Sequence, residues 1–212
     1  MDTIENGKAY EQELTRIFDN CNKYFYNGEL PDVIITFVPT KNAHGHMTVR
    51  PVWVSHDENE DKAKYELNIS AYTIDRSPDE ITATMLHEQA HLYNIIHNIQ
   101  DCTNMGRYHN RKFKKTAEDH GLICYEYSNY YGYNNTRLTE AAKVIVHSKI
   151  RVKQFELKRV ENPRAGKTLI KLVCPNCGNF CYVTKRQLDS NSVLCGSCKL
   201  QMTPEKEKSH DE

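Results

Sequence analysis

Apolar residues recur at helical spacing in two long stretches of the chain. Between residues 9 and 27 they follow the i, i+4, i+7 and i+8 pattern of an amphipathic helix, and Gly28 is a natural stop. Between residues 81 and 96 the same period returns after Ser77-Pro78-Asp79-Glu80. This tetrapeptide offers an N-cap serine, a proline at the first helical position and the glutamate of a capping box. The pattern therefore predicts two helices, the second of which starts next to Ser77.

Shorter segments follow strand patterns. Residues 33–38 are a β-branched run, residues 65–70 alternate apolar and polar, and residues 49–54 are a weaker candidate. We expect the strand at 65–70 to run into the second helix and to form one edge of a substrate cleft, where an extended peptide could add. Further helices are expected at 108–121 and 139–147. The mixture predicts an α+β domain in which a small sheet packs on the second helix.

The second helix contains the sequence His87-Glu88-Gln89-Ala90-His91, an H-E-x-x-H motif. His87 and His91 are four residues apart, so both imidazoles face one side of the helix and can reach one metal ion. Glu88 projects beside that ion, where a carboxylate can take a proton from a metal-bound water. The motif predicts a catalytic zinc site.

A catalytic zinc usually has three protein ligands, so one more is needed after His91. His97 has the metzincin spacing, although Asn94 replaces the glycine that turns the chain in that pattern. Because residues 95–96 continue the apolar period, the helix is expected to run on and to carry His97 away from the metal. Helix geometry favours His109, which a loop returns at the start of the next helix. The isolated loop histidines His44, His46 and His56 are not expected to be ligands.

Further residues accompany these histidines. They are Leu14-Thr15-Arg16-Ile17-Phe18, Asn22, Tyr24-Phe25, Leu30-Pro31 and His109-Asn110-Arg111-Lys112-Phe113. With the H-E-x-x-H helix, this set resembles the SprT-like family, whose eukaryotic relatives are the Spartan proteases. The family pairs H-E-x-x-H with a later H-G-x-x-F-type element and often ends in a zinc ribbon.

The resemblance covers residues from about 9 to 200 and implies a zincin-like metallopeptidase. It implies His87, His91 and His109 as zinc ligands and Glu88 as the catalytic carboxylate. The implied substrate is protein bound or crosslinked to DNA. Asn110 stands where the family often has glycine, which leaves the local backbone open.

A second metal site is expected near the C-terminus. Cys174 and Cys177 form one C-x2-C pair, and Cys195 and Cys198 form another after 17 residues. This spacing is typical of a closed four-cysteine zinc site that folds a small module and does no chemistry, and it leaves Cys181 free. We expect strands at 151–160 and 167–173, joined by a turn at 162–166. The predicted organisation is a metallopeptidase domain at 1–147, a small β zinc ribbon at 148–201 and a disordered tail at 202–212.

The net charge of zero conceals an asymmetry. Residues 1–147 hold 15 Lys and Arg against 21 Asp and Glu, whereas residues 148–201 hold 11 against 3. The basic ribbon, with Phe155, Phe180 and Tyr182 among its cations, is therefore expected to bind DNA through phosphate contacts and base stacking.

The N-terminus lacks the basic and apolar regions of a signal peptide, and no apolar run could span a membrane. We therefore expect a cytoplasmic protein with no membrane partner, whose eight cysteines bind metal or stay reduced. The expected function is a zinc metalloendopeptidase with one catalytic and one structural zinc. The alternative is a nucleic-acid-binding adaptor in which the metal site is a scaffold.

Overall fold

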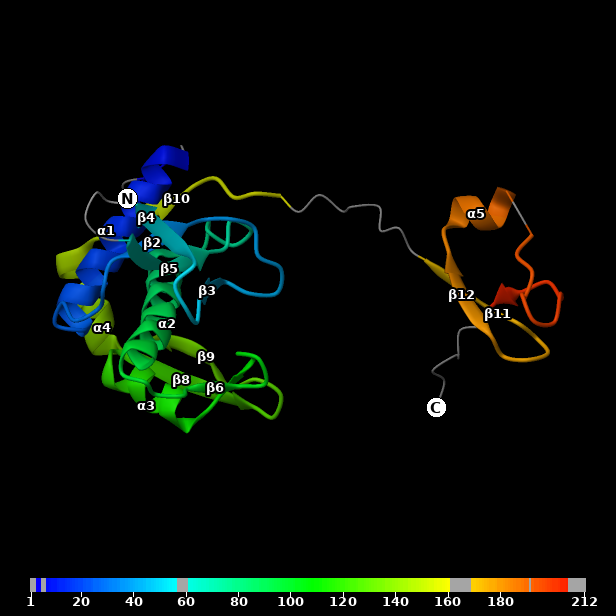
Figure 1. Ribbon diagram of the computed structural model, residues 1–212. Coiled ribbons are helices and arrows are strands. Elements are labelled where there is room, and N and C mark those ends of the chain that lie inside the picture. Colours follow the sequence, from blue (N-terminus) through cyan, green and yellow to red (C-terminus); the bar gives the residue numbers. More distant parts are fainter. Residues whose placement is uncertain (1–2, 5–6, 57–60, 161–168, 191, 206–212) are drawn as a thin grey trace. The chain divides into compact units, whose positions relative to one another are not determined.

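The computed structural model describes residues 3–4, 7–56, 61–160, 169–190 and 192–205 (Figure 1). The chain divides into two compact units, Met1–Val160 and Glu161–Glu212, called here the first and second units. Both α-helices and small sheets are present, so the α+β prediction is confirmed at this level. Among the described residues, no helix has both the length and the apolar character to cross a bilayer.

Four α-helices lie in the described part of the first unit. They are α1 (Gly7–Phe25), α2 (Pro78–Ile96), α3 (Arg111–Asp119) and α4 (Glu140–Ile145), the last continuing as a π-helical turn, η1 (Val146–Ile150). Its strands are β1 (Thr3–Ile4), β2 (Val33–Thr36), β3 (Gly45–Met47), β4 (Trp53–His56), β5 (Asp61–Ile69), β6 (Cys102–Thr103), β7 (Tyr108–His109), β8 (Leu122–Ser128), β9 (Gly132–Leu138) and β10 (Gln154–Phe155).

Helix α2 runs through the middle of the first unit, between the sheet that contains β5 and the hairpin of β8 and β9 (Figure 1). Its start follows from local chemistry, because the Ser77 hydroxyl accepts from the Glu80 amide while the Glu80 carboxylate accepts from the Ser77 amide. Leu86, Ala90 and Leu92 are fully buried in the core. The predicted helix and its N-cap are confirmed.

The sheet that contains β5 has the strand order β2-β5-β3. Strand β2 is parallel to β5, β3 is antiparallel to it, and β4 also pairs with β5. The predicted strand at 65–70 is therefore central. The expectation that it forms the edge of the cleft is wrong, because β2 and β3 cover its two sides. Among the described strands, β3 takes the edge position on the side of α2.

The second sheet has the order β6-β7-β9-β8 and lies against α2 and α3. Strands β8 and β9 form an antiparallel hairpin with two irregularities in register. Short strand β7 pairs with β6 on one side and with β9 at a single position, His109 with Gly132, on the other. This sheet therefore places His109 next to α2.

Residues 151–160, called here the strap, belong to the first unit. The predicted pairing of the strap with 167–173 is wrong: β10 pairs with β1, and β11 pairs with strands of the second unit. The reason is burial, since Val152 and Phe155 enter the large core of the first unit. The division between units therefore lies after Val160 instead of after His147.

The second unit is a small sheet with its own core. Its elements are β11 (Ile170–Val173), β12 (Phe180–Val183), α5 (Lys185–Ser190) and β13 (Thr203–Pro204), with the strand order β12-β11-β13. Leu172, Val183 and Met202 pack around the cysteines. The predicted disordered tail begins too early, because β13 pairs with β11; residues 206–212 and the predicted turn at 162–166 lie outside the described residues.

Candidate metal centre

Three imidazoles from two elements meet in the first unit. His87 and His91 lie one turn apart on α2, and His109 comes from β7. The Nε2 atom of His109 is 3.2 Å from Nε2 of His87 and 3.1 Å from Nε2 of His91. The structure thus brings together the three histidines that sequence reasoning named as ligands.

The spacing of these nitrogens suits a tetrahedral metal ion. Zinc holds imidazole nitrogens at about 2.0–2.1 Å, which separates two nitrogens by about 3.3 Å. Burial, with the neighbouring imidazoles, lowers the pKa of His87 well below its usual value, and burial lowers the pKa of His109 to about 4. Both rings are therefore neutral at pH 7, the form in which imidazole binds metal. The donor set fits zinc.

The outer nitrogen of each ring has a hydrogen-bond partner. Nδ1 of His91 donates to the Asp101 carboxylate at 2.7 Å, Nδ1 of His87 lies 3.1 Å from the Thr136 hydroxyl, and Nδ1 of His109 donates to the Tyr131 carbonyl at 3.3 Å. These contacts occupy the outer nitrogens and leave the three Nε2 atoms directed at one another, as in metal-bound histidines.

Asp101 is the charged member of this outer set, and it is buried. Burial alone would lower the pKa of His91, but its hydrogen bonds with Asp101 and Cys102 and the charge of Glu88 raise that pKa to about 10. The Asn94 amide also donates to Asp101, at 3.0 Å, and the Thr116 hydroxyl donates to Asn94 at 2.7 Å. A buried polar chain therefore ties His91 to α3.

Sequence reasoning missed Asp101 and Thr136 as partners of the histidines. It treated Asn94 only as a departure from the metzincin pattern. One signal was available, because Asn94 is a polar residue inside an otherwise apolar stretch of helix and is fully buried.

Glu88 is buried, and its carboxylate faces β3. A Cβ atom at Gly45 of β3 would lie 3.1 Å from Oε1 of Glu88 and 2.8 Å from the Asn68 carbonyl oxygen. Burial raises the pKa of Glu88 to about 7, against the lowering effect of His91 and with a further rise from Asp101. The carboxylate can therefore exchange a proton near neutral pH.

His44, His97 and His120 have contacts of their own outside this trio. His97 is the C-cap of α2, and its Nε2 is 2.8 Å from a Glu29 carboxylate oxygen. Nδ1 of His44 lies 3.1 Å from the Thr73 hydroxyl, and His120 donates to the Thr116 carbonyl. The helix therefore continues past Asn94, as its apolar period predicted, and His97 is not brought to the other rings.

The backbone around His109 is held on both sides. His109 lies on β7, two residues before α3, and not on the helix itself as expected. Asn110 is the N-cap of α3: its side chain accepts from the amides of Lys112 and Phe113. Asparagine is a favoured N-cap residue, so this contact gives Asn110 a structural role at the position after His109. Opposite, a Cβ at Gly132 would overlap the His109 carbonyl, so only glycine fits.

Phe113 forms the floor of the centre. Its ring centroid lies 4.6 Å from those of His87 and His109 and 4.7 Å from that of His91. The ring is fully buried and keeps the inner side of the three imidazoles dry. Water exclusion on this side strengthens every electrostatic interaction at the centre.

A second candidate metal site lies in the second unit. The sulfur atoms of Cys174, Cys177, Cys195 and Cys198 all lie within 4.8 Å of one another. Cys177 and Cys195 are 3.6 Å apart, close to the spacing of about 3.8 Å in a tetrahedral four-thiolate zinc site. Main-chain amides at Cys198 and Ser197 lower the pKa of Cys195 to about 6. Cys181 lies outside the set, with its sulfur 3.8 Å from that of Met202.

Comparison with protein families gives one match. The model of the SprT-like family matches residues 14–138, which contain the three histidines and Glu88. No curated protein matches the chain, and no solved structure does.

Proposed function

The chain belongs to the SprT-like family, and we propose that it is a zinc-dependent endopeptidase. The observation that carries this proposal is the convergence of three Nε2 atoms from His87, His91 and His109. Two of these histidines flank a buried carboxylate, Glu88. A purely structural zinc site needs a fourth protein ligand, whereas three imidazoles leave one position for a reactant.

In such a centre zinc supplies Lewis acidity toward a water molecule and toward the carbonyl of the peptide. Glu88 accepts the proton that the attacking water loses and returns it to the leaving amine. The packing of Glu88 against Gly45 holds its carboxylate in place between α2 and β3. Phe113 and the buried polar chain behind His91 hold the three rings fixed during this cycle.

The edge strand β3 supports an extended peptide as substrate. The Ser70 amide donates to the His44 carbonyl at 2.8 Å, and the Thr48 amide donates to the Glu66 carbonyl at 3.0 Å. Because hydrogen-bonded positions alternate in an antiparallel pair, the main-chain groups of Gly45 and Met47 point away from β5. A peptide that adds to this edge passes Glu88 with its main chain. In this proposal β3 takes the role at the edge of the cleft that was predicted for residues 65–70.

We also propose that the second unit associates with nucleic acid, by stacking more than by charge. Phe180 and Tyr182 are 60% and 57% exposed, and Nζ of Lys171 lies 5.0 Å from the Phe180 ring centroid. Both rings offer faces on which bases can stack. Residues 161–212 hold eight Lys and Arg against six Asp and Glu, far less basic than the predicted ribbon. Phe155 takes no part, because it is buried in the first unit.

The test is Glu88→Gln, which keeps the volume and removes the proton acceptor. We expect the variant to bind two zinc ions per chain, as the wild type does, and to lose about 10²–10⁴-fold in cleavage of an unfolded protein such as casein. Glu118→Gln, at an exposed position on α3, is the matched control and should cleave normally. Equal cleavage by wild type and Glu88→Gln would contradict the mechanism. A wild-type chain that binds only one zinc ion and still binds DNA would favour the alternative function, a nucleic-acid-binding adaptor.

A further inference from the structure

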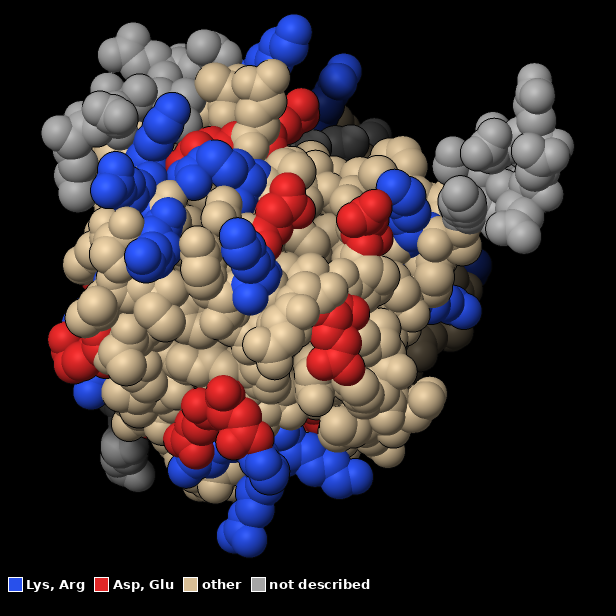
Figure 2. All heavy atoms as spheres, turned by 90° about the vertical axis from the view of Figure 1, so that its left-hand side faces the viewer, with Lys and Arg blue, Asp and Glu red and all other residues tan. Residues whose placement is uncertain are grey.

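Half of the cationic excess of residues 148–201 lies on the first unit, because residues 148–160 hold five Lys and Arg against one Glu, and residues 161–201 hold six against two Asp and Glu. The strap contains Arg151, Lys153, Lys158 and Arg159, with Glu156 as its one acidic residue. All four cationic side chains are exposed, and among the described residues only Lys158 pairs with a carboxylate, that of Asp75 at 2.8 Å. Lys and Arg gather in the upper part of the face in Figure 2, where Figure 1 places β10 and the start of α1. The charge is thus attached to the unit that holds the three histidines.

The strap is fixed to the first unit along its length. Phe155 and Val152 enter the core, and the Arg16 guanidinium donates to the carbonyls of Ile150 and Arg151. Further hydrogen bonds run from the strap amides: Lys153 to the Glu13 carboxylate at 3.0 Å, Leu157 to the Tyr10 hydroxyl at 2.6 Å and Arg159 to the Ala71 carbonyl at 2.8 Å. A segment held in this way presents its cations without the entropy cost of ordering a loose tail.

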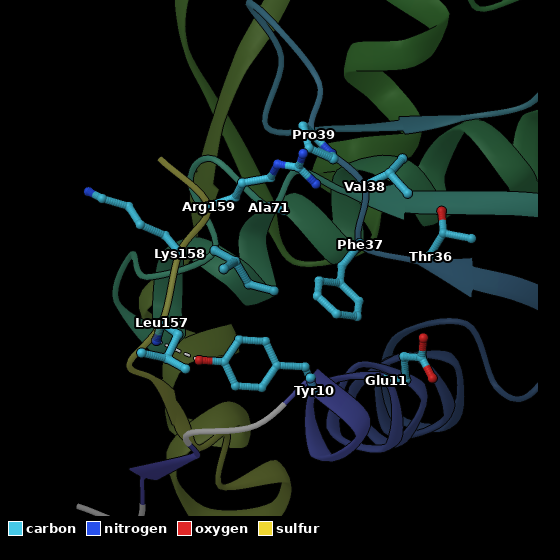
Figure 3. Close-up of a pocket in the computed structure, with 12 residues that line it drawn as sticks. Tyr10, Glu11, Thr36, Phe37, Val38, Pro39, Ala71, Leu157, Lys158 and Arg159 are labelled. Atoms are coloured by element: carbon cyan, nitrogen blue, oxygen red, sulfur yellow. Dashed lines mark hydrogen bonds between the residues drawn. The ribbon is translucent and has the colours of Figure 1, made fainter. Parts of the chain in front are cut away.

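An apolar pocket of about 500 Å³ lies directly beside the strap. Leu157 and Ile74 line it together with the rings of Phe37 and Tyr10, whose centroids are 5.9 Å apart. Figure 3 shows Arg159 extending its guanidinium over the pocket toward Pro39 and Val38, while Lys158 points away. Glu11 is on the rim at the opposite end. The pocket thus combines an aromatic wall with a cation at one end.

We propose that the strap and this pocket form a binding site for single-stranded nucleic acid. One unstacked base enters the pocket against Phe37, and the adjoining phosphates contact Arg159 and Lys153. The pocket volume falls within the range of small-ligand sites, and base stacking on aromatic rings with cations alongside is the usual chemistry of single-strand recognition. A duplex keeps its bases stacked and cannot fill the pocket. The net positive strap favours a polyanion over the apolar side chain of a peptide.

This inference rests on the proposed association with nucleic acid, and it adds a second contact on the catalytic unit. The experiment uses the full chain and a fluorescein-labelled 20-nucleotide oligothymidylate, with anisotropy measured at several salt concentrations. Arg159→Ala and Lys153→Ala should each weaken binding and reduce the salt slope by about 0.7. Phe37→Leu keeps an apolar side chain but removes the ring, and it should weaken binding about fivefold or more. Lys112→Ala, an exposed cation on α3, is the matched control and should change nothing.

Two further measurements use a blunt-ended DNA duplex and a chain with both exposed rings of the second unit replaced. Arg159→Ala should still weaken duplex binding, whereas Phe37→Leu should not. Arg159→Ala and Lys153→Ala should still weaken oligothymidylate binding in a chain that also carries Phe180→Leu and Tyr182→Leu. Unfolding midpoints and zinc content of each variant show whether it folds.

Three results overturn the inference in distinguishable ways. If only Phe180→Leu and Tyr182→Leu weaken binding, the proposed site at the strap is wrong and the proposed association of the second unit with nucleic acid stands. If Phe37→Leu leaves oligothymidylate binding unchanged but slows peptide cleavage, the pocket serves a peptide side chain. If the wild type binds no oligonucleotide, both nucleic-acid proposals fail while the peptidase proposal remains.

Discussion

The Nδ1 atom of His91 lies 2.7 Å from the Oδ2 atom of Asp101, and this contact sets which nitrogen of His91 faces the other two rings. The main chain of Asp101 acts on a second histidine, because its carbonyl accepts from the amide of Asn110, the residue after His109. One residue thus holds His91 on α2 by its side chain and the neighbour of His109 on β7 by its backbone. A metal centre built from two elements depends on such a link.

Asp101→Ala should lower zinc affinity at the catalytic site by about 10- to 100-fold, the usual effect of removing an outer partner of a ligating histidine. Competition with a chromophoric chelator measures this affinity directly. Zinc bound at the four cysteines proposed as a site in the second unit would be the internal reference, and its affinity should not change. Asp119→Ala, at an exposed position on α3, is the matched control. Unchanged affinity of the catalytic site in Asp101→Ala would show that the contact does not position His91.

The same contact predicts how the metal-free protein responds to alkaline pH. The pKa of His91 is about 10 in the fold and about 6.5 in an unfolded chain. Because the folded state retains a proton that the unfolded state releases, the stabilisation is complete below pH 6.5 and is lost as pH rises to 10. Urea unfolding of the chelated protein at pH 7 and pH 9.5 should show a loss of up to a few kcal/mol.

Asp101→Asn is the control for this pH effect. It should reduce the loss between the two pH values, because a neutral amide does not favour the imidazolium. The titration of Glu88 does not interfere. Its pKa is raised from 4.5 to about 7 in the fold, so the stabilisation from its bound proton is lost mainly between pH 4.5 and 7. Equal pH dependence in wild type and Asp101→Asn would contradict the prediction.

Gly45→Ala should abolish cleavage while both zinc ions stay bound. The added Cβ would meet the Asn68 carbonyl at 2.8 Å, which is backbone and cannot move easily, and Glu88 at 3.1 Å. Either β3 or the Glu88 carboxylate must then shift, and a displacement of this size at a catalytic group costs rate steeply. Gly196→Ala is the control, because nothing lies within 4 Å of a Cβ there. Normal cleavage by Gly45→Ala would show that the position of Glu88 against β3 is unimportant.

Sequence reasoning located α2 because its signals are local. The capping box at Ser77 and the spacing of His87 and His91 involve residues within one or two turns. His109 was predicted as the third ligand at the start of a helix; the structure brings its ring beside those of His87 and His91, but from β7. Its actual position depends on the pairing of β7 with β6 and β9, which no short pattern in the sequence reveals.

The strap shows a different limit. Phe155 was expected to stack on bases among the cations of the ribbon, but it is buried with Val152 in the core of the first unit. Hydrophobic spacing does not say against which partner a side chain packs. The nearby cysteine pairs suggested the ribbon, whereas the larger core of the first unit buries both side chains. The same ambiguity hid Asp101 and Thr136, whose contacts with histidines join residues from separate elements.

A chain truncated after His147 should be much less stable than one truncated after Val160. The shorter chain loses Ile150, Val152 and Phe155 from the core, together with the acceptors of the Arg16 guanidinium. Phe155→Ala alone should cost about 3–5 kcal/mol, as other buried Phe→Ala changes do. Urea unfolding of the two truncated chains measures the difference. Equal stability of the two would mean that the strap does not belong to the first unit.

Loss of the cysteine site should affect the second unit alone. Cys174→Ser should remove one zinc ion per chain and unfold residues 169–205, because we expect so small a core to fold only with zinc bound at its four cysteines. Zinc analysis and limited proteolysis measure the two effects. Cys181→Ser is the matched control, since that sulfur lies outside the four-cysteine set. Casein cleavage without DNA should continue in Cys174→Ser, because the first unit has its own core and its own candidate metal centre. Loss of cleavage together with the second zinc would mean that the two units do not fold independently.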